Sequence, residues 1–220
     1  MGNLQIAIDG PAGAGKSTIA KKLAEGLNIT YIDTGAMYRA LTYKVLKENI
    51  EINCKEKIIQ LAETTNITIV HGDVYIDNQL VKDEIRSQEV TKYVSHIAQI
   101  AEVRKILVGF QKKIAEQHSV VMDGRDIGTY VLPNADIKIF LTASIEERAH
   151  RRYTELLHKQ QQVSFADVID SIKERDKIDT EREFAPLVKA ADAVVVDTTG
   201  LDIEAVVEKI QQIIAKKLQN

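Results

Sequence analysis

Residues 7–18, "AIDGPAGAGKST", place three glycines and a proline between an apolar run and a Lys-Ser-Thr triplet. Before the glycines, residues 4–9 alternate between apolar and polar types, which predicts a short strand. After them, apolar residues recur at helical spacing over residues 19–27, so Lys16 opens an amphipathic helix. Strand, glycine loop and helix in this order predict a phosphate-binding loop, because glycine lets backbone N–H groups approach an anion closely.

The loop predicts how a nucleoside triphosphate would be held. The helix N-terminus offers unpaired N–H groups and a partial positive charge. Lys16 can reach the β- and γ-phosphates, and the Ser17 hydroxyl can bind Mg²⁺. The alternative is a flexible turn before an ordinary helix, which would not explain both flanking elements. The predicted ATP-binding residues of the loop are Gly10, Pro11, Ala12, Gly13, Ala14, Gly15, Lys16, Ser17 and Thr18.

The remaining chain alternates between strand and helix patterns. Continuous apolar runs at 119–123 and 137–142 are typical of strands covered on both faces. This pattern predicts a three-layer αβα fold with a parallel sheet. Residues 67–81 instead alternate across a His-Gly-Asp turn and an Asp-Asn turn, which predicts a small antiparallel sheet inserted in the domain.

One P-loop domain can therefore be divided into three parts. We expect a core at about 1–35, 119–150 and 183–220, and an insertion at about 36–118. A short lid at about 151–182 would contain the polar loop "HKQQQVS". Further strands are expected at 30–33 and 193–197, and helices at 34–48, 56–63, 84–117 with a break near Ala101, 145–157, 165–180 and 203–218.

Composition narrows the function classes. The net charge of −3 argues against a nucleic-acid binder. The single cysteine, Cys54, excludes an internal disulfide and fits a reducing compartment. The N-terminal segment lacks a signal-peptide pattern, and no apolar run is long enough to span a membrane. We expect a cytoplasmic monomer that binds neither membranes nor nucleic acid.

Two further clusters follow predicted strands. "DTGAMYR" contains Asp33 and Thr34, which a capped helix start would explain, but also Tyr38 and Arg39 one turn later. "VVMDGRDIG" ends a strand with Asp123, where P-loop proteins hold Mg²⁺. A plain Asp-Gly turn would need neither of the Arg125 and Asp126 side chains that follow.

Arginines form two stripes at helical spacing. One stripe consists of Arg148, Arg151 and Arg152, and the other of Arg175, Asp179 and Arg182. Solvated, salt-bridged helices are the common explanation for such stripes. Beside a P-loop, however, arginines can neutralise the charge that develops during phosphoryl transfer.

At these residues the chain resembles the bacterial cytidylate kinase family. The resemblance rests on the ordered set "GPAGAGKST", "DTGAMYRA", "DGRDIGT", "IFLTAS", "ERAHRR" and "RD" followed by "APLVKAADAVVVDT", and it covers nearly the whole chain. It implies an ATP- and Mg²⁺-dependent kinase that converts CMP and dCMP to CDP and dCDP. It also implies a three-stranded insertion, which the segment at 67–81 matches.

The resemblance implies roles for individual residues. Lys16, Arg125, Arg148 and Arg182 would neutralise charge on the phosphoryl group being transferred. Arg148, Arg151 and Arg152 would belong to the ATP and lid side, and Mg²⁺ would bind at Ser17 and Asp123. The substrate residues would be Arg39, Arg125 and Arg182 at the monophosphate, Ser95, Arg104 and Asp126 at cytosine, Arg175 and Asp179 at the ribose, and Asp33, Thr34 and Tyr38 lining the site. The segment "RDKIDTER" has fewer basic residues than relatives often carry, which weakens the lid assignment but leaves the functional positions intact.

Three other functions are compatible with parts of the sequence. Another small-molecule kinase, of the UMP or shikimate type, would share the loop but not need the cytosine-reading set. A regulatory GTPase would fit "DTTG", but that segment follows the last strand and no Asn-Lys-x-Asp signature exists. A non-catalytic nucleotide-binding module would leave the acceptor-side arginines without a purpose.

Overall fold

The computed structural model describes residues 3–70 and 72–218. Its main sheet has five parallel strands in the order β2-β6-β1-β7-β8. These strands are β1 (Gln5–Asp9), β2 (Thr30–Asp33), β6 (Val120–Gly124), β7 (Ile137–Thr142) and β8 (Val194–Asp197). The expected αβα fold with a parallel sheet is therefore confirmed.

Helices cover both faces of this sheet. On one face, α1 (Lys16–Leu27) and α8 (Ile203–Leu218) pack on the strands through one apolar cluster. On the other face, α5 (Ala101–Gln117) and a short π-helix, η2 (Ile127–Val131), pack against β6. Every residue of β6 is buried, which explains its uninterrupted run of apolar residues before Asp123.

The expected inserted sheet is present as β3 (Ile67–Val70), β4 (Asp73–Ile76) and β5 (Gln79–Val81), paired antiparallel in that order. His71, in the predicted His-Gly-Asp turn, lies outside the described residues, as do the first two residues of the N-terminal segment. The helices beside this sheet are α2 (Thr34–Lys47), α3 (Lys55–Thr64), the 3₁₀ turn η1 (Glu84–Arg86) and α4 (Gln88–Ala98).

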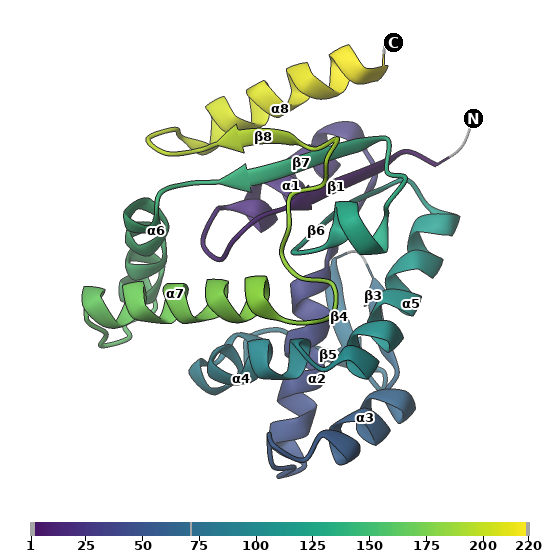
Figure 1. Ribbon diagram of the computed structural model, residues 1–220, viewed down its shortest axis with the longest axis vertical. Helices are drawn as coiled ribbons and strands as arrows, with labels where there is room; N and C mark the ends of the chain where they lie inside the picture. The colour runs from purple at the N-terminus through teal and green to yellow at the C-terminus, as the bar shows by residue number, and fades with distance from the viewer. Residues whose placement is uncertain (1–2, 71, 219–220) are drawn as a thin grey trace.

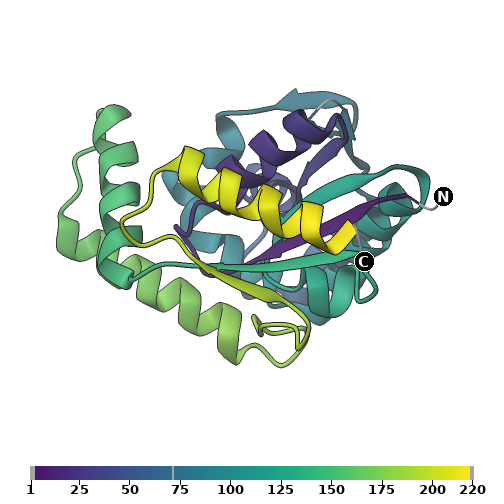
Figure 2. The same ribbon diagram turned by 90° about the horizontal axis from the view of Figure 1, so that it is seen from above.

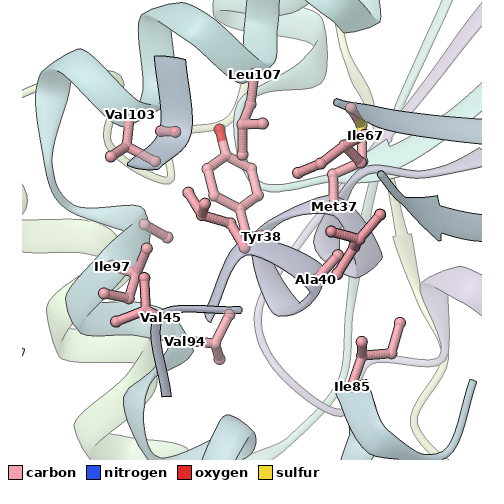
Figure 3. Close-up of a cluster of buried hydrophobic side chains, with 14 of the residues drawn as sticks. Met37, Tyr38, Ala40, Val45, Ile67, Ile85, Val94, Ile97, Val103 and Leu107 are labelled. Atoms are coloured by element: carbon pink, nitrogen blue, oxygen red, sulfur yellow. The ribbon is translucent and has the colours of Figure 1, made fainter. Parts of the chain in front are cut away.

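This part of the chain has a hydrophobic core of its own. The cluster is formed by residues between Ala36 and Leu107. Figure 3 shows Tyr38 of α2 projecting toward Val103 and Leu107 of α5. A separate core supports the predicted division between insertion and P-loop core, which remains a prediction.

Helices α6 (Ile145–His158) and α7 (Phe165–Glu181) lie side by side at one end of the sheet (Figure 1). Seen from above, α6 and α7 stand at the end of the molecule away from the chain termini (Figure 2). Helix α7 also contacts α4 of the insertion. The chain thus brings α7 between the P-loop side and the insertion, which matters for the site described next.

Candidate active site

The glycine loop has the backbone geometry that its sequence predicts. Gly10 has a φ of 151°, and a Cβ there would lie 2.0 Å from the Leu141 carbonyl oxygen. Gly15 has a φ of 86° and precedes α1, whose N-terminus has no side-chain cap. The loop therefore needs glycine at both positions, and the start of α1 keeps amide groups for an anion.

Lys16 is held inside this loop. Its Nζ donates to the Pro11 carbonyl at 2.7 Å, and the residue is 6% exposed. Burial and, to a lesser extent, the nearby Arg125 charge lower the Lys16 pKa to about 7, against the opposing effect of Asp123. A phosphate group bound here would stabilise the charged form of Lys16, because a nearby opposite charge favours ionisation and offsets the effect of burial.

Oxygen ligands meet where β2 and β6 end side by side. Asp123 accepts from the Ser17 hydroxyl and the Tyr31 hydroxyl, both at 2.9 Å. Asp33 is the register neighbour of Asp123. Burial raises the Asp123 pKa to about 7, and the charge of Asp33 adds to the effect.

This donor set fits Mg²⁺. The ion prefers oxygen ligands and keeps several water or phosphate ligands beside one or two carboxylates. Within 3–70 and 72–218, no group of three or more His, Cys, Asp or Glu side chains could hold a metal ion. The Ser17 hydroxyl and the Asp123 carboxylate are oxygen ligands of the kind that Mg²⁺ prefers.

The side chains of Asp33 and Thr34 both form hydrogen bonds with other parts of the protein. The Asp33 carboxylate caps α2 by accepting from the Ala36 amide at 2.9 Å, and it pairs with Arg86 at 3.3 Å. The Thr34 hydroxyl donates to the Asp123 carbonyl at 2.7 Å. The capping interpretation thus accounts for Asp33, while Thr34 fixes the end of β6 beside it.

A buried network of arginines and aspartates lies next to the P-loop. Arg104 pairs with Asp126 at 2.5 Å, and Arg125 pairs with Asp179 at 2.7 Å. Arg182 joins the two pairs, lying 3.5 Å from Asp126 and 3.6 Å from Asp179. The charges come from α5, the segment after β6, and α7, so residues far apart in the chain converge here.

The network has unused binding capacity. The hydroxyl of Tyr38 and Nε of Arg104 are buried and have no hydrogen-bond partner among the described residues. The Arg104 guanidinium lies 5.1 Å from the centroid of the Tyr38 ring. Buried polar atoms without partners are costly, so these atoms point to a polar ligand that would satisfy them.

Electrostatics in the network favour an anion. Burial opposes ionisation of Asp179, but Arg125 and Arg182 together hold its pKa below the usual range. Burial lowers the pKa of Arg182, and Arg104 lowers it further by repulsion. Arginines that repel one another gain stability when a phosphate enters between them.

The other predicted acceptor residues lie around this network. Ser95 is buried on α4, and Nε of Arg175 on α7 is buried without a hydrogen-bond partner. Arg39 donates to the Thr91 hydroxyl at 2.9 Å. Burial lowers the Arg39 pKa to about 9, with repulsion from Arg175 adding to it.

Two hollows flank the site. One, of about 520 Å³, is lined by Arg39, Arg86, Thr91, Arg152, Glu155, His158 and Lys159. The other, of about 1730 Å³, separates α1 and β2 from the inserted sheet and reaches the site at Ser17, Tyr31 and Asp33. The larger hollow lies mostly away from the arginine network. The network and the P-loop therefore mark the candidate site, although the larger hollow lies elsewhere.

The three arginines of α6 go to different places. Arg148 is buried beneath the P-loop, where its Nη1 donates to the Ala12 carbonyl at 2.8 Å. Arg151 donates to the Thr198 hydroxyl and carbonyl at 2.9 and 2.8 Å, beyond β8. Arg152 is half-buried and pairs with the exposed Glu155 at 3.0 Å within the same helix. Although the three arginines are close in sequence, their side chains therefore contact different parts of the protein.

Three functional candidates were missed from the sequence: Asp9, Tyr31 and Asp176. The position of Asp9 at a strand end just before Gly10 was a usable signal. Asp176 accepts from the Ala12 amide at 3.0 Å and pairs with Arg148 at 2.5 Å. Asp176 belongs to the "RD" pair that contributes to the resemblance, but the sequence assigned it no role.

Asp9 braces the segment that carries Asp126. Its carboxylate accepts from the amides of Ile127 and Gly128, both at 2.7 Å, and is 4% exposed. Burial nevertheless dominates and raises the Asp9 pKa from 3.8 to about 6, against these hydrogen bonds.

This shift makes a prediction about stability and pH. A raised pKa means that the contribution of Asp9 is fully present below its ordinary pKa and lost as pH rises through about 6. Between about pH 5 and pH 7.5, the free energy of unfolding of the wild type should fall by about 1 kcal/mol more than that of Asp9→Asn. Urea denaturation at both pH values measures this, and parallel curves would contradict it.

Comparisons with known proteins identify the family of this chain. A family model described as cytidylate kinase matches residues 6–216. A cytidylate kinase from Alkaliphilus oremlandii is 62% identical over 207 residues, covering 94% of this chain and 95% of its own. A cytidylate kinase from Clostridioides difficile is 55% identical over 210 residues, covering 96% and 97%.

Solved structures share the fold at low identity. An uncharacterised protein from Eubacterium ventriosum has a TM-score of 0.55 at 17% identity, covering 97% of this chain and 99% of its own. A gluconokinase from Sinorhizobium meliloti has a TM-score of 0.50 at 14% identity, covering 97% and 92%. In the part of the chain that the structure describes, no helix has the length and apolar character needed to cross a membrane. The family match and the two relatives, each covering almost the full length, show that this chain belongs to the cytidylate kinase family of nucleoside monophosphate kinases.

Proposed function

We propose that this protein transfers the γ-phosphoryl group of ATP to CMP and dCMP in the cytoplasm, acting as a monomer without a nucleic-acid or membrane partner. The observation that carries the proposal is the buried network of Arg104, Asp126, Arg182, Asp179 and Arg125 beside the P-loop. It combines positive charge for a phosphate with a carboxylate that could accept from an amino group. A base-bearing monophosphate has both features.

On the donor side, the loop from Gly10 to Thr18 would hold the ATP phosphates through Lys16 and through backbone amides that are not already engaged. Ser17 and Asp123 would hold Mg²⁺, which when bound neutralises part of the phosphate charge. Arg148 lies close enough to the loop to assist, since it already contacts the Ala12 carbonyl. Arg151 and Arg152 would face the ATP and the lid.

On the acceptor side, each group of residues would recognise one part of the monophosphate. Arg39, Arg125 and Arg182 would bind the phosphate, and Ser95, Arg104 and Asp126 would bind cytosine. Arg175 and Asp179 would face the ribose, while Tyr38 would line the pocket. Asp33 and Thr34 would shape the wall, since their own hydrogen bonds hold α2 and β6 together.

The reaction needs positioning and charge neutralisation more than acid-base chemistry. The phosphate of a nucleoside monophosphate is already an anionic nucleophile, so no general base is required. The assigned arginines and Lys16 would supply cations on both sides of the point of transfer, and such groups act through electrostatic stabilisation.

Water must be kept out so that ATP is not hydrolysed. The predicted mobile loop at 158–164 lies against the insertion, where Gln88 Nε2 donates to Gln161 Oε1 at 3.2 Å. This exposed contact supports a lid that reaches the monophosphate-binding part of the chain. The division of the chain into core, insertion and lid belongs to the same proposal.

A coupled assay for ADP release tests the function. CMP, dCMP, UMP, AMP and shikimate are offered in turn with ATP and Mg²⁺. The proposal requires the highest kcat/KM with CMP or dCMP. Preference for UMP or shikimate would favour the other small-molecule kinases, and a tight GDP complex without transfer would favour a GTPase.

Arg182→Met should weaken CMP binding and slow transfer together. The residue is 6% exposed and faces two carboxylates, so a solvated surface pair does not describe it. A cation against a phosphate is worth about 1.5–3 kcal/mol, whereas an exposed pair is worth about 0–1 kcal/mol.

Steady-state kinetics with CMP measure this effect, and kcat/KM should fall by roughly 10- to 150-fold. Lys177→Met, at an exposed position of the same helix, is the matched control and should stay near wild type. Unchanged kcat and KM in Arg182→Met would remove Arg182 from the phosphate site.

A further inference from the structure

Two carboxylates of α7 lie one helical turn apart and hold different parts of the site. Asp176 accepts from the Ala12 amide of the P-loop at 3.0 Å and pairs with Arg148 at 2.5 Å. Asp179 pairs with Arg125 at 2.7 Å and with Arg182 at 3.6 Å. One rigid helix therefore touches both the ATP-binding loop and the arginines assigned to the monophosphate.

The contact with the P-loop involves more than one bond. Asp176 accepts from the Ala12 amide, while Arg148 donates to the Ala12 carbonyl at 2.8 Å and to the Ala143 carbonyl at 3.1 Å. Both backbone groups of Ala12 are thus engaged by a charged pair. Arg148 is buried and Asp176 is half-buried, so this charge-assisted pair is partly shielded from solvent.

The opposite end of the link is equally constrained. Arg182 ends α7, and its guanidinium donates to the Ala185 carbonyl while facing Asp126 and Asp179. A shift of α7 that displaced Asp176 from the P-loop would also move Asp179 and Arg182. The two substrate sites therefore cannot adjust independently.

We propose that Asp176 is a positioning residue that couples the donor and acceptor sites through α7. The inference rests on the proposed function and adds the residue that joins its two halves. Binding of ATP, by ordering the P-loop, would order Asp176 and with it the arginines that receive CMP. Coupling of this kind is reciprocal, so CMP would strengthen ATP binding by the same factor.

The test compares CMP binding with and without a bound ATP analogue. Calorimetry gives the CMP dissociation constant for the free enzyme and for the enzyme saturated with a β,γ-methylene analogue of ATP and Mg²⁺. In the wild type we expect the analogue to tighten CMP binding at least fivefold, the lower end of typical coupling. In Asp176→Ala the ratio should fall to within twofold of unity, while CMP alone binds within threefold of wild type.

Two more variants separate positioning from folding. Asp170→Asn changes the same charge at an exposed position of α7 and should keep the wild-type ratio. Asp176→Asn keeps the size of the side chain but removes the charge that holds Arg148, so its ratio should fall at least twofold. It also serves if Asp176→Ala does not fold.

A structural role alone would lower the melting temperature of the Asp176 variants and leave the ratio and the kcat of the folded enzyme unchanged, which would overturn the proposal. A wild-type ratio near one, or the failure of both variants to fold, would also overturn it. If the wild type neither binds nor phosphorylates CMP, the proposed function fails instead. Phosphorylation of CMP with an unchanged ratio in the variants refutes only the coupling.

Discussion

Lys16→Ala is expected to lower kcat with ATP and CMP by at least 100-fold while the protein stays folded. Lys16 is the cation at the centre of the glycine loop, where its Nζ donates to the Pro11 carbonyl at 2.7 Å. Groups that stabilise charge developing in the transition state are worth about 3–4 kcal/mol, or 10²- to 10³-fold in rate.

In the free protein, the electrostatic environment of Lys16 indicates a role in function rather than in stability. Burial and Arg125 lower its pKa to about 7, so the charged form is disfavoured until phosphate arrives. A lysine that mainly stabilised the fold would be expected to form an ion pair with a carboxylate. Removing Lys16 should therefore cost activity and leave the free energy of unfolding nearly unchanged.

Lys21→Ala, at an exposed position of the same helix, provides the control for Lys16→Ala. Circular dichroism and urea denaturation establish that both variants are folded, and single-turnover kinetics then measure transfer. If Lys16→Ala kept a tenth of the wild-type turnover, Lys16 would not have the role assigned to it.

Elements with strong local patterns could be predicted closely from the sequence. The glycine loop, the fully buried β6 and the inserted hairpins all carry signals within a few residues, and the structure confirms them. The break in the long helical segment is also confirmed, since α4 ends at Ala98 and α5 begins at Ala101. The π-helix after Asp126 was not expected, because its amides depend on a carboxylate, Asp9, that is distant in sequence.

Site residues could be predicted where they belong to a local sequence motif. They could not be predicted where their role depends on contacts with segments distant in the sequence. Helical spacing placed Arg148, Arg151 and Arg152 near one another, but their partners are the P-loop, the turn after β8 and a neighbouring glutamate. The "RD" pair drew attention to Asp176, but its role could not be inferred, since that role depends on where α7 lies against Ala12. Charge patterns on a helix do not reveal which tertiary surface each side chain meets.

Asp126 is expected to set the preference for cytosine over uracil. Its carboxylate is 3% exposed and faces Arg104 and Arg182, beside the unpartnered Tyr38 hydroxyl. A carboxylate accepts from the amino group at position 4 of cytosine, whereas uracil presents a carbonyl oxygen there. The alternative, that Asp126 caps the following turn, finds no support, since its side chain makes no capping hydrogen bond to η2.

The ratio of kcat/KM for CMP to that for UMP, compared between the wild type and Asp126→Ala, measures this preference. Because Ser95 and Arg104 would share the recognition, we expect Asp126 to supply about 2–3 kcal/mol, so the ratio should fall by roughly 30- to 150-fold. Alanine also leaves Arg104 buried without its partner, which costs stability. Asp126→Asn, which keeps the size of the side chain, therefore serves as the companion variant, and both must be shown to fold. A folded variant whose ratio moves by less than about threefold, under 1 kcal/mol, would show that Asp126 holds the arginines in place without reading the base.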